Sequence, residues 1–176
     1  MKFDIDKSID ILNRTPYVLE AMLEDLSSEW LHNNEGGDSW SPYTILGHLI
    51  HGEKTDWIPR ARVILSGEDN KPFIPFDRFA QLEKDQDVPI AELLLEFRDL
   101  RSKNIEELKA MNLNEDKLSM TGVHPELGEV QLKELISTWT VHDLGHISQI
   151  SRVMASQYSS EVGPWSQYLT ILHKVQ

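Results

Sequence analysis

The residues best suited to chemistry in this chain are two histidines four positions apart, His142 and His146. On a helix, this spacing places both imidazoles on one face, one turn apart, where they can bind the same metal ion. Apolar residues around them recur every three or four positions, which predicts a helix over residues 131–156 with both histidines in its apolar stripe. Polar groups facing a core need partners, so the pair is either a metal site or a pair of hydrogen-bonded or surface histidines.

Two ligands from one helix rarely hold a metal ion, so a third must come from another segment. His48 and His51 lie in a second predicted helix, His48 at the edge of its apolar arc and His51 further onto its polar side. An edge position suits a cleft between helices, and it also suits an ordinary surface histidine. The remaining candidates are weaker, because His32 lies at a helix end, His124 in a loop and His173 near the end of the chain.

Charged residues also fall on the apolar faces of these helices. Asp143 lies near the middle of its stripe, where a bare carboxylate is costly. It either serves the histidines, as an orienting partner or a general base, or forms a buried salt bridge, for which Arg60 is a candidate. Glu53 and Arg60 are seven apart and can reach each other or a pocket. The run 142–146 is similar to the HExxH signature of zinc proteases, but an aspartate replaces the glutamate and no downstream residue has third-ligand spacing, which argues against a protease.

The composition narrows the class of protein. A chain of 176 residues, 40% of them hydrophobic, suits a single domain over residues 1–176 with a substantial core. It has no cysteine, which excludes disulfides, thiolate metal sites and a cysteine nucleophile. The net charge of -12 argues against a nucleic-acid partner. The acidic N-terminal residues and the lack of a long apolar run argue against a secretory signal and a membrane span. We therefore expect a cytoplasmic protein that acts on a small molecule.

The elements that must position these side chains are predicted to be helices, which gives an all-α fold. The predicted helices cover residues 4–32, 41–65, 89–111 and 131–156, with a short fifth helix over 164–174. Pro16 either kinks the first helix or starts a second segment, and Pro59 should kink or divide the second helix.

Two connections are long enough to carry structure of their own. Residues 68–87 form a long connection from which we expect Phe73, Ile74, Phe76 and Phe79 to pack onto the bundle. Residues 118–131 read as a short hairpin or an extended loop.

Several segments, in this order and spacing, resemble the DinB-like (DinB/YfiT-like) family of metal-dependent enzymes. The resemblance covers nearly the whole chain. It rests on Trp40-Ser41, Ile45-Leu46-Gly47-His48-Leu49, residues 127–135, residues 139–150, Gly163-Pro164-Trp165 and Tyr168-Leu169.

The resemblance implies an up-down-down-up four-helix bundle, often a homodimer, whose metal is held by one histidine of the second helix and the HxxxH pair of a later helix. By its position after the tryptophan, His48 rather than His51 matches, so the implied ligands are His48, His142 and His146. Zn²⁺ and Ni²⁺ both suit imidazole ligands. For the dimer, Trp30, Trp57 and Trp165 are more large aromatics than one modest core needs, and exposed ones could mark an interface.

The implied activity is that of a metal-dependent enzyme. Some relatives transfer a low-molecular-weight thiol, and hydrolysis suits the same site. Because the chain lacks cysteine, a thiol would have to come from a cofactor. The alternatives are a non-catalytic bundle that binds a metal or a small molecule, and a structural domain with vestigial histidines.

Overall fold

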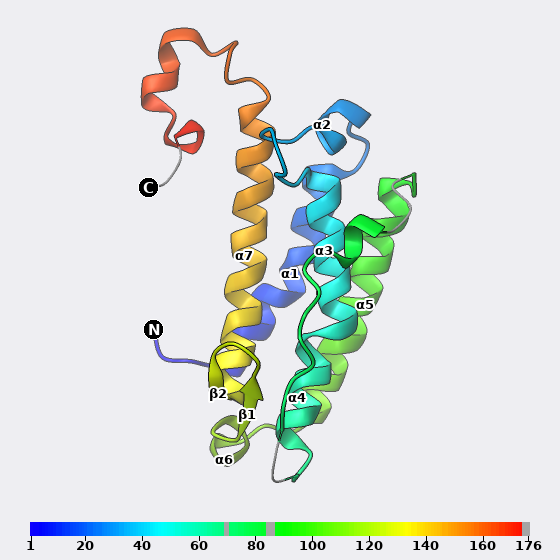
Figure 1. Cartoon of the computed structure of the whole chain (residues 1–176), viewed down its shortest axis with the longest axis vertical. Helices are drawn as coiled ribbons and strands as arrows, with labels where there is room; N and C mark the ends of the chain where they lie inside the picture. The colour runs from blue at the N-terminus through cyan, green and yellow to red at the C-terminus, as the bar shows by residue number, and fades with distance from the viewer. Residues whose placement is uncertain (69–70, 84–86, 174–176) are drawn as a thin grey trace.

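The protein is seen in a computed structural model that describes residues 1–68, 71–83 and 87–173, and long helices dominate it (Figure 1). The bundle consists of α1 (Ile5–Leu23), α3 (Pro42–Thr55) continued by α4 (Trp57–Leu65), α5 (Ile90–Ala110) and α7 (Leu132–Ser156). In Figure 1, α1 and α7 run upward, whereas α3–α4 and α5 run downward. The predicted all-α fold with up-down-down-up topology is therefore confirmed.

The predicted first helix is interrupted, and this prediction was wrong in its length. Helix α1 ends at Leu23, and a separate short helix, α2, covers Ser28–His32. Between them Asp25 has a φ of 57°, a left-handed conformation that aspartate tolerates better than most residues and that a helix cannot continue through.

Pro16 does not start a new segment, because α1 runs through it. A proline has no N–H to donate to the carbonyl four residues earlier, here that of Leu12. The buried side chain of Arg101 replaces the missing donor, with its Nη1 2.8 Å from the Leu12 carbonyl oxygen. A residue of α5 therefore stabilises the proline within α1.

The second predicted helix begins and divides as expected. Ser41 caps α3, since its hydroxyl accepts from the N–H of Thr44 at 3.2 Å. The helix is divided at Asp56, between α3 and α4. The ring of Pro59 conflicts with the carbonyl four residues earlier, that of Thr55, and the division falls at this point.

Of the two alternatives for residues 118–131, a short hairpin or an extended loop, the structure has the hairpin. It follows a short helix, α6 (Glu115–Leu118), and pairs β1 (Thr121–His124) antiparallel with β2 (Gly128–Gln131). The long connection adds a bridge to its edge, where the Phe73 N–H donates to the Val123 carbonyl and the Val123 N–H donates to the Lys71 carbonyl, both at 2.8 Å.

Residues 71–83, which we call the strap, follow α4 in the chain, run upward alongside α4 and α3 in Figure 1 and end in a short 3-10 helix, η1 (Ala80–Glu83). Phe73 is buried and Phe76 half-buried, as expected. Ile74 and Phe79 are 86% and 55% exposed, so the prediction that they pack onto the bundle was wrong. Successive side chains of extended chain point to opposite sides, so burying Phe73 turns Ile74 toward solvent.

The predicted fifth helix is not an α-helix. Its region holds two 3-10 helices, η2 (Gly163–Tyr168) and η3 (Thr170–Leu172), and Lys174, the predicted end, lies outside the described residues. Trp165 and Tyr168 are 70% and 75% exposed. A short helix that buries no apolar face is marginal in water, which explains the difference. Figure 1 shows this tail leaving the top of α7 and turning back downward.

The core consists of two apolar clusters that share the same helices. One contains Trp57, Ile105 and Trp139, and the other Leu49, Phe97 and Ile150. On α3–α4, α5 and α7, the positions between the two clusters carry buried or half-buried polar residues. These are Glu53, Arg101, Asn104, His142, Asp143 and His146. Four residues singled out from the sequence, Glu53, His142, Asp143 and His146, thus belong to a polar layer between two apolar ones.

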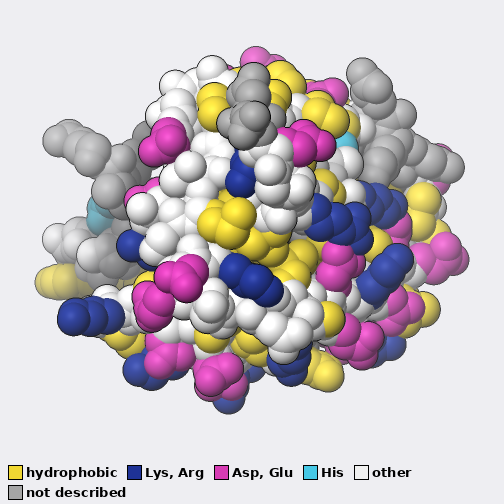
Figure 2. All heavy atoms as spheres, turned by 90° about the horizontal axis from the view of Figure 1, so that it is seen from below, with side chains coloured by type: hydrophobic (Ala, Val, Ile, Leu, Met, Phe, Trp, Pro, Cys, Tyr) yellow, Lys and Arg dark blue, Asp and Glu magenta, His cyan; other side chains and the backbone are white. Residues whose placement is uncertain are grey.

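Among the described residues, no helix combines the length and the apolar character that a bilayer crossing requires. Seen from below (Figure 2), acidic and basic side chains are interspersed on this end of the molecule, with hydrophobic side chains between them. The negative charge is therefore not gathered on this face.

Candidate metal centre

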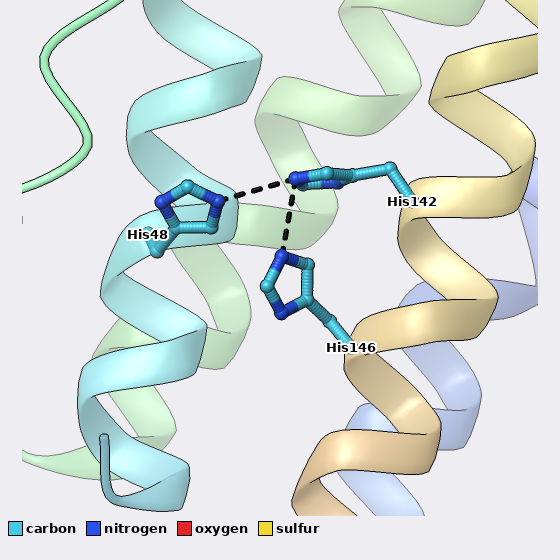
Figure 3. Close-up of side chains that lie close together, drawn as sticks. All are labelled: His48, His142 and His146. Atoms are coloured by element: carbon cyan, nitrogen blue, oxygen red, sulfur yellow. Dashed lines mark hydrogen bonds between the residues drawn. The ribbon is translucent and has the colours of Figure 1, made fainter. Parts of the chain in front are cut away.

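The three histidines of the predicted site meet between two helices. His48 comes from α3, and His142 and His146 come from successive turns of α7 (Figure 3). The Nε2 atom of His142 lies 3.1 Å from the Nε2 atom of His48 and 3.1 Å from that of His146. Each of the three rings offers a nitrogen, and these nitrogens all lie within 4.8 Å of one another.

This geometry fits a shared cation better than hydrogen bonds alone. An imidazole nitrogen carries one proton or one lone pair, so His142 Nε2 cannot make two full hydrogen bonds with its two neighbours. Two ligand nitrogens on a tetrahedral ion lie roughly 3.3 Å apart, close to the two separations of 3.1 Å from His142. The donor set is also suitable, because neutral imidazole is a common ligand of divalent transition metals.

Burial keeps the imidazoles neutral. Removal from water, together with the neighbouring charges of His146, His51 and Arg78, lowers the pKa of His48 from 6.5 to about 3. Burial likewise lowers the pKa of His142 to about 3, and it lowers the pKa of His146. Lone pairs on these rings are therefore available for a metal at neutral pH.

One side chain orients a ring of the cluster. The amide oxygen of Gln149 lies 2.8 Å from Nδ1 of His146, an arrangement that holds Nε2 toward the cluster. Among the described residues, the Nδ1 atoms of His48 and His142 are buried without a hydrogen-bond partner. Sequence reasoning did not identify Gln149, although its spacing of three residues from His146 places it on the same helix face.

Asp143 belongs to a buried ionic network and not to the histidine cluster. Its two carboxylate oxygens lie 2.6 and 3.1 Å from the guanidinium of Arg101, which is 1% exposed. Glu53 accepts from the same guanidinium at 2.8 Å, and also from Asn104 Nδ2 and Trp139 Nε1. Of the two interpretations of Asp143, the buried salt bridge is therefore correct, but its partner is Arg101 and not Arg60.

In this network, two carboxylates stabilise the buried charge of the Arg101 guanidinium. Burial disfavours the charged guanidinium of Arg101, but the carboxylates of Glu53 and Asp143 outweigh burial and raise its pKa above the usual value. With the Leu12 carbonyl, the network joins α1, α3, α5 and α7. It turns Asp143 toward the core and thereby sets the rotation of α7 that leaves His142 and His146 facing α3.

Arg60 and Glu53 do not reach each other. Arg60 pairs with Asp56, with 2.7 Å between Nε and Oδ1, and its guanidinium lies over the Phe73 ring at 5.1 Å. Burial raises the pKa of Asp56 to about 6, against the opposing effect of the Arg60 charge. Arg60 lines a cavity, whereas Glu53 is enclosed in the network.

The histidine cluster lies at a cavity of about 450 Å³ between α3–α4, α7, the hairpin and the strap. Aromatic rings form much of its wall: Trp40 lies 4.9 Å from the His48 ring, Phe76 packs edge-on against it at 5.4 Å, and Trp57 packs edge-on against His142 at 5.1 Å. The cavity has room for a small organic molecule next to the histidines.

The other histidines stay outside the cluster. His51 lies one turn from His48, where its ring is 5.0 Å from Phe76. His32 packs against Tyr43, and His173 is exposed. His124 lines the cavity from the hairpin, but its Nδ1 accepts from the N–H groups of residues 126 and 127, both at 3.2 Å.

The sequence model of the DinB superfamily matches residues 11–150, which include the three clustered histidines. The chain belongs to the DinB superfamily. This bears out the resemblance noted from the sequence motifs.

No curated protein matches the sequence significantly. Among solved structures, the fold is similar to that of YfiT from Bacillus subtilis, with a TM-score of 0.73 and 19% identity over 93% of this chain and 90% of that one. YfiT is described as "a probable metal-dependent hydrolase with an unusual four-helix bundle topology". The likeness shows that this DinB superfamily member shares the bundle fold of YfiT.

Proposed function

We propose that the protein is a metal-dependent enzyme that acts on a small molecule, with one divalent ion held by His48, His142 and His146. The observation that carries the proposal is the convergence of three neutral imidazoles, one buried and two half-buried, at the wall of a cavity large enough for an organic substrate. Membership of the DinB superfamily and the description of YfiT as "a probable metal-dependent hydrolase" support the same class of reaction.

Different residues of the chain would have different roles at this site. The three histidines would hold a zinc or nickel ion, and Gln149 orients His146. The rings of Trp40, Trp57 and Phe76 would exclude water from the substrate's apolar part. When bound, the ion would supply Lewis-acid chemistry and favour the deprotonated form of a nucleophile.

The nucleophile is water in a hydrolase or a low-molecular-weight thiol in a transferase. A transferred thiol must be a second small molecule, since the chain contains no cysteine. Asp143 is not proposed as a general base, because both of its oxygens are bonded to Arg101.

Metal content tests the ligand assignment. Protein purified without chelators or a histidine tag should carry about one divalent ion per chain, and His142→Ala or His146→Ala should abolish tight binding, because two imidazoles hold such an ion poorly. His48→Ala should do the same, whereas His51→Ala, one turn away, should retain the metal. Full metal content in all three variants of the cluster would refute the assignment.

Turnover tests the reaction class. Hydrolysis of ester and amide substrates without added thiol would identify a hydrolase, whereas turnover that requires an added thiol would identify a transferase. Either activity should be lost in His142→Ala and kept in His51→Ala. A wild-type protein that carries metal but turns over neither class of substrate would instead be a binding protein.

A further inference from the structure

Arg78 is a cation at the cavity for which the described residues provide no partner. It lines the cavity from the strap, and in the described part of the chain its guanidinium has no hydrogen bond and no ion pair. The second arginine of the cavity, Arg60, is already neutralised by Asp56 at 2.7 Å. Elsewhere, Arg62, Arg101 and Arg152 all contact carboxylates. Arg78 is therefore available to a ligand in a way that Arg60 is not.

The strap that carries Arg78 is held in place on both sides of it. Before Arg78, the Phe76 ring packs edge-on against His48 at 5.4 Å. After it, the buried Gln81 lies against Gly47, the residue next to His48, and donates through Nε2 to the Arg78 carbonyl at 2.8 Å. The backbone of Arg78 is therefore fixed beside the histidine cluster, and its side chain is the adjustable part.

The charge of Arg78 acts on the cluster itself. It is one of the groups that lower the pKa of His48. The carboxylates that line the cavity lie on other elements: Asp56 is paired with Arg60, and Glu134 accepts from the N–H of Gln131 at the start of α7. Glu126 lies in the turn of the hairpin.

We propose that Arg78 is a specificity-determining residue that binds an anionic oxygen group, a carboxylate or a phosphate, on a substrate whose apolar body packs against Trp40, Trp57 and Phe76. The inference rests on the proposed function, because it takes this cavity as the substrate site. A guanidinium forms charge-assisted, two-pronged hydrogen bonds with such anions, and the aromatic walls weaken competition from water.

A ligand-binding titration tests this on the full-length protein loaded with zinc, followed by the fluorescence of the cavity tryptophans. The probes are 3-phenylpropanoate, phenyl phosphate and the uncharged 3-phenylpropanamide. We expect at least one anion to bind about tenfold or more tightly than the amide, as one charge-assisted contact predicts. The stronger of the two anions identifies the group as carboxylate or phosphate.

Variants test whether Arg78 causes the preference for the anion over the amide. Arg78→Gln should reduce it to about twofold or less while leaving amide binding nearly unchanged. Arg98→Gln is the matched control, because Arg98 lies on α5, which contributes no residue to the cavity, and pairs with Glu20. It should behave as the wild type.

Two results would overturn the inference: equal binding of both anions and the amide by the wild type, or an anion preference that persists in Arg78→Gln. The same titration on His142→Ala separates this inference from the proposed function. A preference that survives in this variant and still depends on Arg78 supports the anion subsite even if the protein proves not to be a metalloenzyme. Its loss in His142→Ala would assign the anion to the metal ion and refute the role of Arg78.

Discussion

At the scale of single residues, Arg101 explains three features that look unfavourable in the sequence. Glu53 and Asp143 lie on apolar helix faces, and Pro16 interrupts the hydrogen bonding of α1. The guanidinium of Arg101 contacts both carboxylates and the carbonyl that Pro16 leaves without a donor. Removing one partner from such a buried group leaves the others without compensation.

We therefore expect Arg101→Ala to lower the free energy of unfolding by about 3–5 kcal/mol, measured by urea denaturation. The control is Arg98→Ala, which breaks a pair near the surface, with Glu20 at 3.5 Å, and should cost about 1 kcal/mol or less. Equal losses in the two variants would contradict the importance of the network.

Burial of the cluster also predicts how stability depends on pH. The pKa of His48 and of His142 is about 3 in the folded protein and near 6.5 in the unfolded chain, so between these values the unfolded chain binds more protons. The free energy of unfolding of metal-free protein should therefore fall as the pH is lowered from about 6.5 toward 3.

Denaturation of chelator-treated protein at about pH 7.5 and about pH 5 measures this slope. Because carboxylates also titrate at low pH, the comparison is with His142→Gln, which should show a smaller loss than the wild type. His173→Gln, at an exposed position, should match the wild type. An unchanged slope in His142→Gln would show that this histidine does not contribute.

At the scale of elements, the strap and the hairpin depend on each other through Gly122. A methyl group at this position would lie 2.6 Å from the Phe73 ring and 2.9 Å from Ile64. Phe73 is buried, its own N–H donates to the Val123 carbonyl, and the Lys71 carbonyl accepts from the Val123 N–H, so Phe73 has little room to move away. The glycine therefore lets the strap close one wall of the cavity.

Gly122→Ala should destabilise the protein by about 1–3 kcal/mol, as expected for overpacking. Gly145→Ala is the matched change within α7, where a methyl group would meet nothing within 4 Å. It should leave stability unchanged or raise it by up to about 1 kcal/mol, because alanine favours helix more than glycine does. Thermal denaturation of both variants measures the difference, and a stabilising Gly122→Ala would refute the proposed close contact.

At the scale of the whole molecule, hydrophobic residues remain exposed on the outer faces of two neighbouring helices. They are Tyr17 and Val18 on α1, and Val141 and Leu144 on α7. Of the tryptophans considered for an interface, Trp57 is buried against Trp139, Trp30 packs against Tyr158, and Trp165 is exposed. Clustered exposed apolar residues are typical of contact surfaces. The homodimer stays a prediction, and the outer faces of α1 and α7 are its expected interface.

Sedimentation at micromolar concentration should show a dimer in the wild type. Leu144→Glu should shift it toward monomer, because a carboxylate in an apolar interface is costly. Leu95→Glu introduces the same charge at a similarly exposed position on α5 and should leave the dimer intact. A wild-type monomer, or equal dissociation of both variants, would contradict the prediction.

The sequence by itself determined the features that depend on local backbone geometry. The periodicity of apolar residues predicted the main helices to within a few residues for α5 and α7, since each helical residue advances by about 100°. The same rule placed His142 and His146 on one face. The family motifs selected His48 over His51, and the structure brings these three histidines together.

Only the tertiary structure decided the features that depend on contacts between separate elements. Asp143 pairs with Arg101 and not with Arg60, because the packing of α5 and α7 against α1 and α3 brings the Arg101 and Asp143 side chains together across the bundle. The loss of the fifth helix reflects apolar side chains, such as that of Trp165, that no surface of the bundle covers. Arg78 became a candidate only when the strap brought it to the cavity, since no sequence spacing relates it to His48. Local spacing follows from bond geometry, whereas contacts between elements depend on the packing of the whole chain.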